Sequence, residues 1–132
     1  MFAPTATRVN ENTSEDNNRQ IRHTTRQNIE YYLLHKEQIP ARLQALDEEW
    51  DVERALATGS STLTLLGIFL AYFSPFTLLL SLAVQVFYLQ HALQGWCPPL
   101  PLFRKLGFRT EKEIQFERNE LKSLYAVYGP VL

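Results

Sequence analysis

A long stretch without charge is the feature that most constrains what this chain can fold into. No Asp, Glu, Lys or Arg occurs between Arg54 and Arg104, although these four residue types make up 20% of the 132-residue sequence. Water-soluble domains rarely lack charge over such a length, because charged side chains are the ones that stay in contact with water. The stretch therefore predicts a segment in apolar surroundings, with charged regions on either side of it.

The uncharged stretch consists of two apolar runs separated by Ser74–Pro75. The first run covers residues 55–73 and the second covers residues 76–96. Each is close to the roughly 20 residues that cross about 30 Å of hydrocarbon. Proline suits the first turn of a helix, so a short turn at 74–75 can return the chain. The sequence predicts an all-α fold, an integral membrane helical hairpin of two transmembrane helices; the alternative is a buried hairpin of a soluble protein.

Basic residues near the ends of the two runs predict an orientation. Arg54 precedes the first run, whereas the turn between the runs has no basic residue. Arg104, Lys105 and Arg109 follow the second run, and we expect them to contact the membrane surface. Because basic residues are enriched on the cytoplasmic side of membranes, both termini are predicted to be cytoplasmic.

The polar flanks are predicted to be a tail and a set of cytoplasmic helices. Residues 1–20 are rich in Asn, Thr, Ser, Glu and Asp and show no signal-peptide pattern, so a disordered tail is expected there. Residues 21–54 have the spacing of amphipathic helices, with Pro40 opening the second of them. Its predicted apolar stripe consists of Leu43, Leu46, Trp50 and Ala57.

The region after the second run is predicted to be an exit turn followed by a helix. Residues 97–109 hold the prolines and basic residues expected of a turn and a linker, and residues 110–128 have helical periodicity. Thr110 and Glu113 have the spacing of a capping box. The apolar side of this helix is expected to lie on the membrane or on the first amphipathic helix.

Small and polar residues recur at the same spacing in both runs. Small residues allow close approach of helices in lipid, and polar ones can hydrogen-bond across the interface. Folding about Ser74–Pro75 places Thr64 and Gln85 at about the same depth. These residues are predicted to form a packing interface within the hairpin or with a second copy: Ser60, Thr64, Gly67 and Ala71 in the first run, and Ser81, Gln85, Tyr88 and Ala92 in the second.

Cys97 and His91 are the residues of greatest chemical interest. A single cysteine excludes a disulfide within the chain. Cys97 follows a helix C-terminus, which favours a protonated thiol, so packing in the exit turn is the preferred interpretation. The spacing of His91 and Cys97 does not predict a metal site within one chain. We find no catalytic motif and expect no cofactor; flanks of mixed charge also argue against nucleic-acid binding.

The two runs and the "GWCPPLPLFRKLGFRT" that follows them resemble the YgaP-like family (DUF2892), whose function is unknown. The resemblance covers residues 40–124 and includes a G-x-C-P turn, formed here by Gly95, Trp96, Cys97 and Pro98. It implies a two-span module of the bacterial inner membrane, paired as a homodimer and without catalytic residues. Some relatives carry a rhodanese domain; this chain has one cysteine and no room for that domain, so the activity does not transfer.

These observations predict a non-enzymatic membrane protein in contact with lipids, self-associating or serving as an accessory subunit of a larger membrane complex. A two-helix hairpin has little interior for a substrate pocket, which disfavours an enzyme. Two alternatives remain open. One is an oligomeric transporter or channel for a small anion or sulfur species, and the other is a thiol- or metal-dependent sensor that uses Cys97 and His91.

Overall fold

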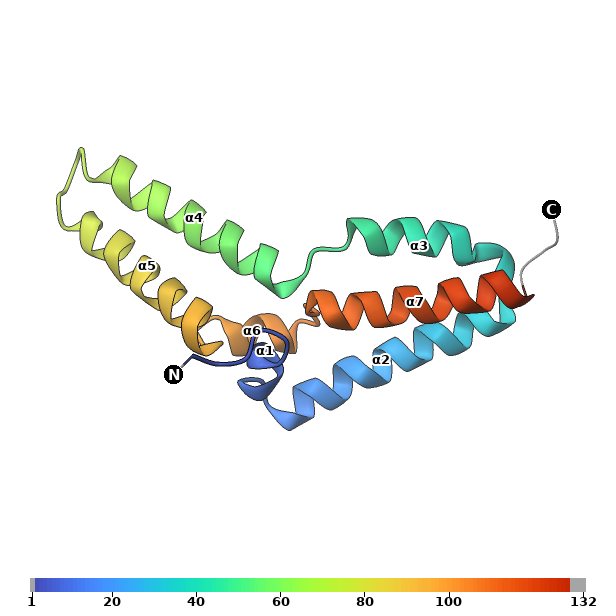
Figure 1. Ribbon diagram of the computed structural model, residues 1–132. Helices are drawn as coiled ribbons and strands as arrows, with labels where there is room; N and C mark the ends of the chain where they lie inside the picture. The colour runs from blue at the N-terminus through green and yellow to red at the C-terminus, as the bar shows by residue number, and fades with distance from the viewer. Residues whose placement is uncertain (1, 129–132) are drawn as a thin grey trace.

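The computed structural model describes residues 2–128, and within that range the chain is helical without strands, as the predicted all-α class requires (Figure 1). The helices are α1 (Arg8–Glu11), α2 (Glu15–Leu34), α3 (Ile39–Glu48), α4 (Val52–Leu70), α5 (Thr77–Gln94), α6 (Leu100–Lys105) and α7 (Glu111–Tyr128). A 3₁₀ turn, η1 (Lys36–Gln38), connects α2 to α3.

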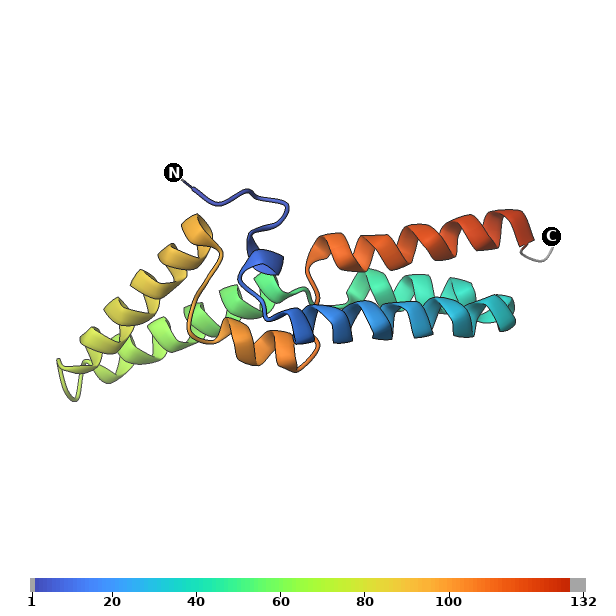
Figure 2. The same ribbon diagram turned by 90° about the horizontal axis from the view of Figure 1, so that it is seen from below.

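The helices form two elongated parts that meet near the middle of the molecule (Figures 1 and 2). We call the antiparallel pair α4 and α5 the hairpin. We call α2, α3 and α7 the platform; α7 lies between the other two and packs against both. The short helices α1 and α6 lie where the hairpin joins the platform.

The platform has a small apolar core between α3 and α7. Its fully buried members are Ile39, Leu46, Ile114 and Leu121, with Tyr32, Leu43, Leu124 and Tyr125 packed around them. Burial of one such side chain stabilises a fold by about 1.5–3 kcal/mol. The apolar side of the C-terminal helix therefore packs mainly on α3, which corresponds to the second predicted amphipathic helix and not to the first, although Tyr32 of α2 adds to the contact.

Buried ion pairs complete the platform. Glu117 of α7 is fully buried and accepts hydrogen bonds from Arg42 at 2.8 Å and from Asn28 at 2.8 Å. Arg104 of α6 is 1% exposed and pairs with Glu113 at 2.7 Å. Because α2, α3, α6 and α7 each contribute to these pairs, polar contacts fix how the helices sit against one another.

Local capping explains where several helices begin and end. Ser14 accepts a hydrogen bond from the Asn17 amide at the start of α2. The predicted capping box is confirmed at α7: the Glu113 amide donates to Thr110 Oγ1 at 3.2 Å, and the Thr110 amide donates to Glu113 Oε1 at 2.8 Å. Such a cap is typically worth about 1 kcal/mol.

The structure differs from the disordered tail predicted over residues 1–20. Helix α1 and the first turns of α2 lie in this segment, and Val9 is buried against Cys97 and Leu100. Thr13 donates a hydrogen bond to the Val9 carbonyl oxygen, and Asn18 donates one to the Asn10 carbonyl oxygen. Both side chains also accept hydrogen bonds from the guanidinium of Arg104. The segment has few apolar side chains, and its polar composition therefore predicted disorder. Its order depends on long-range contacts of Val9, Thr13 and Asn18, which composition does not reveal.

The amphipathic helix predicted to continue through residues 40–57 is broken in the structure. Helix α3 ends at Glu48, and Asp51 accepts a hydrogen bond from the Arg54 amide to begin α4. Trp50 therefore lies in the connection, 43% exposed and beneath the Arg54 guanidinium, instead of on the stripe with Leu43. The predicted linker 97–109 likewise contains a helix, α6.

The boundaries of the hairpin also differ from the predicted ones. Helix α4 is Val52–Leu70, not 55–73, because the Asp51 cap brings Glu53 and Arg54 into its first turn. Helix α5 is Thr77–Gln94, not 76–96, and the turn is correspondingly longer. The prediction of two transmembrane helices is not supported: within residues 2–128, no helix has both the length and the mean hydropathy that a membrane crossing requires.

Candidate functional site at the base of the hairpin

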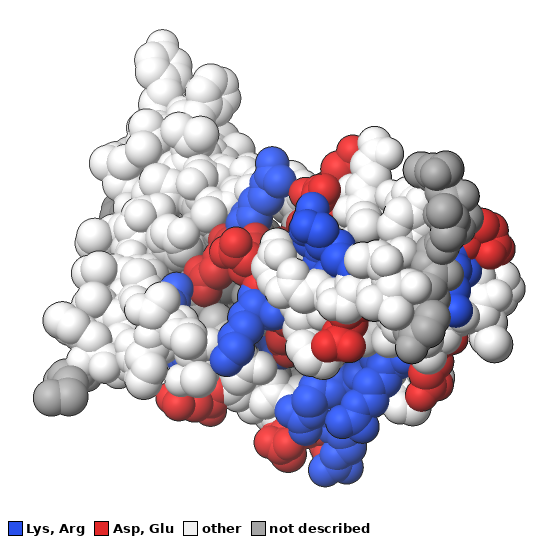
Figure 3. Space-filling model, turned by 45° about the vertical axis from the view of Figure 1, so that its right-hand side comes forward, with Lys and Arg blue, Asp and Glu red and all other residues white. Residues whose placement is uncertain are grey.

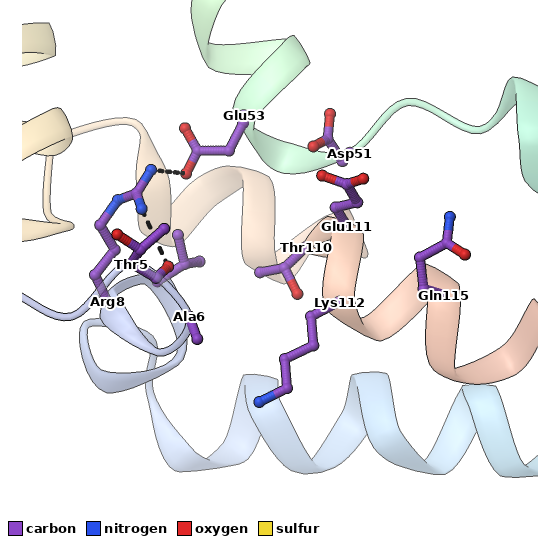
Figure 4. Close-up of a pocket in the computed structure, with 10 residues that line it drawn as sticks. Thr5, Ala6, Arg8, Asp51, Glu53, Thr110, Glu111, Lys112 and Gln115 are labelled. Atoms are coloured by element: carbon purple, nitrogen blue, oxygen red, sulfur yellow. Dashed lines mark hydrogen bonds and ion pairs between the residues drawn. The ribbon is translucent and has the colours of Figure 1, made fainter. Parts of the chain in front are cut away.

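An ion pair between the two helices marks the base of the hairpin. His91 lies in the last turns of α5 and is 1% exposed. Its Nε2 lies 3.0 Å from both carboxylate oxygens of Glu53, in the first turn of α4. The Arg8 guanidinium of α1 donates to the same carboxylate at 3.3 Å (Figure 4). Three segments distant in sequence therefore meet at Glu53.

The charge of Glu53 is stabilised by these partners. Burial alone raises the pKa of a carboxyl group, because it disfavours the charged form. At Glu53 the hydrogen bond to His91, the charge of His91 and the charge of Arg8 more than offset burial, and the pKa lies below its usual value of 4.5. Glu53 is therefore a carboxylate at neutral pH, and it orients the ring of His91.

The exit turn follows directly from this pair. Gly95 ends α5 with a φ of +86°, and its amide donates to the His91 carbonyl oxygen at 2.8 Å. A Cβ at Gly95 would lie 2.5 Å from the Arg8 carbonyl oxygen, so glycine is required both for the turn and for the approach of α1. Trp96 and Pro98 face outward, whereas Cys97 is 2% exposed and packs with Leu56 and Leu100.

An apolar groove opens beside Cys97. It has a volume of about 250 Å³ and lies between α4, α5 and the exit turn. Aliphatic, aromatic and proline side chains form most of its lining; the residues are Leu56, Gly59, Ser60, Leu63, Val84, Phe87, Tyr88, Cys97, Pro98, Pro99 and Phe103. The Tyr88 ring also lies parallel to the His91 ring, 6.4 Å away.

A polar depression of about 450 Å³ lies on the other side of Glu53. Figure 4 shows Asp51, Glu53 and Glu111 around it, together with the cations Arg8 and Lys112. Asp51 is occupied as the cap of α4, and Glu53 by His91 and Arg8. Within residues 2–128, no three His, Cys, Asp or Glu side chains are placed to hold a metal ion together.

The structure brings together four of the residues predicted to form the packing interface. Gln85 Nε2 donates to Thr64 Oγ1 at 2.7 Å, and Ser81 Oγ donates to the Thr64 carbonyl oxygen at 3.0 Å. Gly67 is buried directly against Ser81 and accepts a hydrogen bond from Thr77 Oγ1 at 2.8 Å. These contacts lie within the hairpin of a single chain.

The other predicted interface residues lie elsewhere. Ser60 and Tyr88 line the apolar groove. Ala71 is the C-cap residue that follows α4, and Ala92 is exposed. The predicted stripe is therefore an interface only over its central part, because the two helices diverge toward the base (Figure 2).

Two of the three basic residues predicted at the membrane surface are buried instead. Arg104 also donates to Thr13 at 3.1 Å and to Asn18 at 3.0 Å. Arg109 is 6% exposed and donates to both carboxylate oxygens of Glu49 at 2.9 Å. Glu113, after the uncharged stretch, pairs with Arg104, and Glu49, before it, pairs with Arg109. A count of basic residues ignores these pairs and therefore predicts a surface position for both arginines. Lys105 is exposed, and its contact with a membrane surface stays a prediction.

The apolar surface of the hairpin is the most extensive feature of its exterior. Figure 3 shows a continuous surface without Lys, Arg, Asp or Glu on one part of the molecule and dense charge on the other. The exposed apolar side chains include Leu65, Leu66, Ile68, Phe69, Tyr72, Phe73, Phe76, Leu78, Leu79, Leu80, Leu82, Val86, Phe87 and Leu89. Tyr72, Phe73 and Phe76 at the tip are each more than 70% exposed.

Sequence reasoning missed Glu53 and Arg8 as part of the site. They lie 45 positions apart, and no periodicity connects them. A signal was nevertheless present, since Glu53 is the last acidic residue before the uncharged stretch and His91 is the only histidine within it. An acidic residue and a histidine at the base of the same predicted hairpin can form a hydrogen-bonded ion pair.

Comparison of the chain with models of known families, with curated proteins and with solved structures gives no match.

Proposed function

We propose that this chain is a small non-enzymatic membrane protein whose hairpin lies in the lipid bilayer and whose platform remains in water as a docking surface. The observation that carries the proposal is the exposed apolar surface of α4 and α5. Monomeric soluble proteins rarely expose a contiguous apolar patch of more than a few hundred Å². A surface of this kind must be covered by lipid or by another protein.

Lipid is the better match because exposed apolar side chains lie around a wide arc of both helices in the half of the hairpin that includes the tip, whereas the exposed Ser61 and Thr62 lie nearer the base. Leu65, Leu66, Ile68 and Phe69 follow one another around α4 and are all exposed. A helix that is apolar all round belongs in a protein core or a membrane. A partner protein ordinarily covers one face and leaves the others polar.

The polar groups of the hairpin also suit lipid. Backbone and side-chain polar groups in hydrocarbon need partners inside the protein. Thr64, Ser81 and Gln85 satisfy one another between the helices. The same contacts weigh against the oligomeric transporter, because polar side chains bonded to each other are not available to line an aqueous path.

We place the hairpin tip-first in the bilayer of a bacterial inner membrane, with both termini on the cytoplasmic side. No charge would enter the membrane with it, because none lies between Arg54 and Arg104. Beyond its charged first turn, α4 extends about 24 Å from Ala55 to Leu70 at 1.5 Å per residue, which is most of the hydrocarbon thickness. The charged base, with Arg54 and Lys105 exposed, would lie among the lipid headgroups. The YgaP-like resemblance is consistent with this placement and remains a prediction.

The end of the platform far from the hairpin is the proposed contact for a larger membrane complex. Tyr31, Leu33, Leu34 and Val127 are exposed there, and Leu34 is 82% exposed. The packing stripe is already occupied within one hairpin, which favours an accessory-subunit role over a homodimer formed through that stripe. A homodimer through the lipid-facing surface remains the alternative.

Flotation with lipid vesicles tests the membrane proposal. The full chain is synthesised in a cell-free system with vesicles of phosphatidylethanolamine and phosphatidylglycerol and then centrifuged through a density gradient. We expect the wild-type chain to float, and Leu65→Asp on the outer side of α4, near the middle of the hydrocarbon, to lower the bound fraction at least tenfold. A charge in the hydrocarbon costs about 2.5–3.5 kcal/mol at its centre, and about 1.4 kcal/mol is tenfold.

Leu34→Asp is the matched control for this experiment. Leu34 and Leu65 are both exposed leucines, at 82% and 67%, but Leu34 lies on the platform and Leu65 on the hairpin. The control should float like the wild type, yet lose any chains that co-purify with the protein from native membranes in mild detergent. A wild-type chain that stays unbound, or equal loss in both variants, contradicts the proposal.

A further inference from the structure

A second groove lies at the hairpin end of the platform, between α1, α2 and α7. We call it the basic groove; its volume is about 420 Å³. Arg22 and Arg26 of α2 and Lys112 of α7 line it, and Glu113 is the one carboxylate among its lining residues. Figure 4 shows the Lys112 side chain extending from the start of α7 toward α2. The basic groove therefore has cations on both of its long sides.

The carboxylate of the basic groove is already occupied. Glu113 pairs with the buried Arg104 at 2.7 Å and accepts a hydrogen bond from the Thr110 amide at 2.8 Å. Asn10 also donates to it at 3.4 Å. Glu113 therefore balances the charge of Arg104 and does not pair with the cations that line the groove.

Those cations leave the basic groove with an excess of positive charge. Arg22 forms an exposed pair with Glu15 at 3.0 Å. Within residues 2–128, neither Arg26 nor Lys112 forms an ion pair. Arg22 and Arg26 are four residues apart on one face of α2, where like charges repel each other. An anion bound between α2 and α7 would relieve this repulsion.

The basic groove also has an apolar floor. Ile21 of α2 is buried beneath it, and Phe116 of α7 is 54% exposed beside the cations. A small inorganic anion gains nothing from contact with an aromatic ring. The groove thus suits a ligand that joins an anionic group to an apolar one.

The segment that contains α1 connects the basic groove to the hairpin. Asn10 lines the groove, whereas the Ala3 amide donates to the Leu93 carbonyl oxygen at 3.0 Å and Arg8 pairs with Glu53 at 3.3 Å. In the placement proposed above, the base of the hairpin lies among the lipid headgroups, so the groove lies within their reach (Figures 1 and 2). Basic pockets on the cytoplasmic side of membrane proteins bind anionic headgroups.

We propose that the basic groove binds one anionic glycerophospholipid, with the phosphate between Arg26 and Lys112 and the start of an acyl chain along Phe116. This inference rests on the proposed membrane function and names a lipid that the protein selects. An acidic segment of a partner protein would offer the same charge. The lipid is favoured because the groove adjoins the base of the hairpin.

Native mass spectrometry of the full chain in a non-ionic detergent tests the proposal. Phosphatidylglycerol or phosphatidylcholine with the same acyl chains is added, and we expect one phosphatidylglycerol to be retained with at least tenfold preference. Arg26→Gln combined with Lys112→Gln should lower this retention at least tenfold, since each basic residue near an anionic lipid contributes about fivefold. Both side chains are exposed, and circular dichroism verifies that the helices are retained.

The matched control removes the same charge from the same two helices. Arg19→Gln combined with Lys122→Gln changes exposed residues of α2 and α7 that lie outside the basic groove. Retention of phosphatidylglycerol should stay within twofold of the wild type. Equal loss in the two double variants would show attraction to net charge alone and would overturn the proposal.

A competitor separates the lipid from other anions. Glycerol 3-phosphate at the same concentration should not displace phosphatidylglycerol, because it lacks the acyl chains that would contact Phe116. Displacement would overturn the proposal in favour of a free phosphate site. Unchanged retention in the Arg26→Gln, Lys112→Gln variant, together with loss of co-purifying chains, would overturn it in favour of an acidic protein partner.

Flotation keeps this inference distinct from the membrane proposal. The Arg26→Gln, Lys112→Gln variant should still float with lipid vesicles, because its hairpin is unchanged. A wild-type chain that stays unbound contradicts the membrane proposal, whereas a wild-type chain that floats but retains both lipids equally in detergent overturns only the lipid site.

Discussion

The hairpin and the platform of this protein both turn polar groups inward, yet they differ in what those groups are and in what lies outside. The platform and the adjoining α6 and its loop bury full charges beneath a charged exterior: Glu117 is fully buried, and Arg104 and Arg109 are almost so. The hairpin turns neutral groups inward, with the buried Ser81 bonded to the Thr64 carbonyl oxygen, beneath an apolar exterior. Figure 3 shows the boundary between the two surfaces.

This difference reflects what each part must achieve. A buried ion pair loses hydration on both partners and is not a strong source of net stability, but removal of one partner is severe. Close packing of helices in lipid instead relies on small residues and weak neutral hydrogen bonds. The platform is thus specified by charge complementarity, and the hairpin by shape.

The largest effect is expected when the buried carboxylate at the centre of the platform is removed. Glu117 receives hydrogen bonds from Arg42, Arg109 and Asn28, and no part of it is exposed. Glu117→Ala leaves the partly buried Arg42 without its carboxylate and Arg109 with Glu49 alone, which costs about 3–5 kcal/mol. We expect this loss in the free energy of unfolding, measured by urea titration in mild detergent.

The effect should be confined to the platform. Binding to lipid vesicles should change less than twofold in Glu117→Ala, because the hairpin contacts do not involve Glu117. Glu120→Ala, an exposed change on the same helix, should alter stability by no more than about 0.5 kcal/mol. A loss below about 1 kcal/mol for Glu117→Ala would show that the buried pairs do not specify the platform.

A pair of glycines in α4 gives the corresponding test of the hairpin. A Cβ at Gly67 would overlap Ser81 Oγ and lie 3.0 Å from the Thr77 carbonyl oxygen, whereas one at Gly59 meets nothing. Gly67→Ala should cost about 1–3 kcal/mol through overpacking. Gly59→Ala should stabilise by about 0.5–1 kcal/mol, since alanine favours the helix.

Thermal unfolding of both variants, followed by circular dichroism, measures the difference. Opposite shifts in the midpoint temperature are expected, because the two substitutions are chemically identical and differ only in what faces them. Shifts of the same sign would mean that α4 and α5 are not held together by close packing at Gly67.

Local and periodic features were predictable from the sequence, and long-range charge pairing was not. The capping box of Thr110 and Glu113 follows from a spacing of three residues. The contact of Thr64 with Gln85 follows from folding the two apolar runs back on each other about Pro75. Arg104, by contrast, contacts Thr13 and Asn18 at separations of 91 and 86 residues. No local pattern marks an arginine as buried.

The same reasoning explains the errors at the N-terminus and at Trp50. Val9 is a single apolar residue in a polar segment, so its burial beside Cys97 leaves no periodic signal. The break between α3 and α4 depends on the Asp51 cap, within a run of acidic residues that could each continue a helix. The start of α4 is also held by a long-range hydrogen bond, in which the Val52 amide donates to the Arg109 carbonyl oxygen at 2.8 Å.

The smallest expected effect is the acid sensitivity of the platform through Glu113. Burial raises the pKa of this carboxyl, but hydrogen bonds from Arg104 and Thr110 and the charge of Arg104 outweigh burial and hold the pKa below 4.5. A group whose pKa is lower in the folded state stabilises the fold above its unfolded pKa. That stability is lost as the pH falls through the folded pKa.

Stability should therefore fall between about pH 5 and pH 3 more steeply in the wild type than in Glu113→Gln, which has no charge to lose. The loss should be smaller than in Glu117→Ala, because Arg104 keeps its bonds to Thr13, Asn18 and the Phe108 carbonyl when Glu113 is protonated. Urea titrations at stepped pH measure both slopes. Parallel slopes would mean that the Arg104–Glu113 pair has no share in the acid response, and that the contrast between a charge-specified platform and a shape-specified hairpin rests on Glu117 alone.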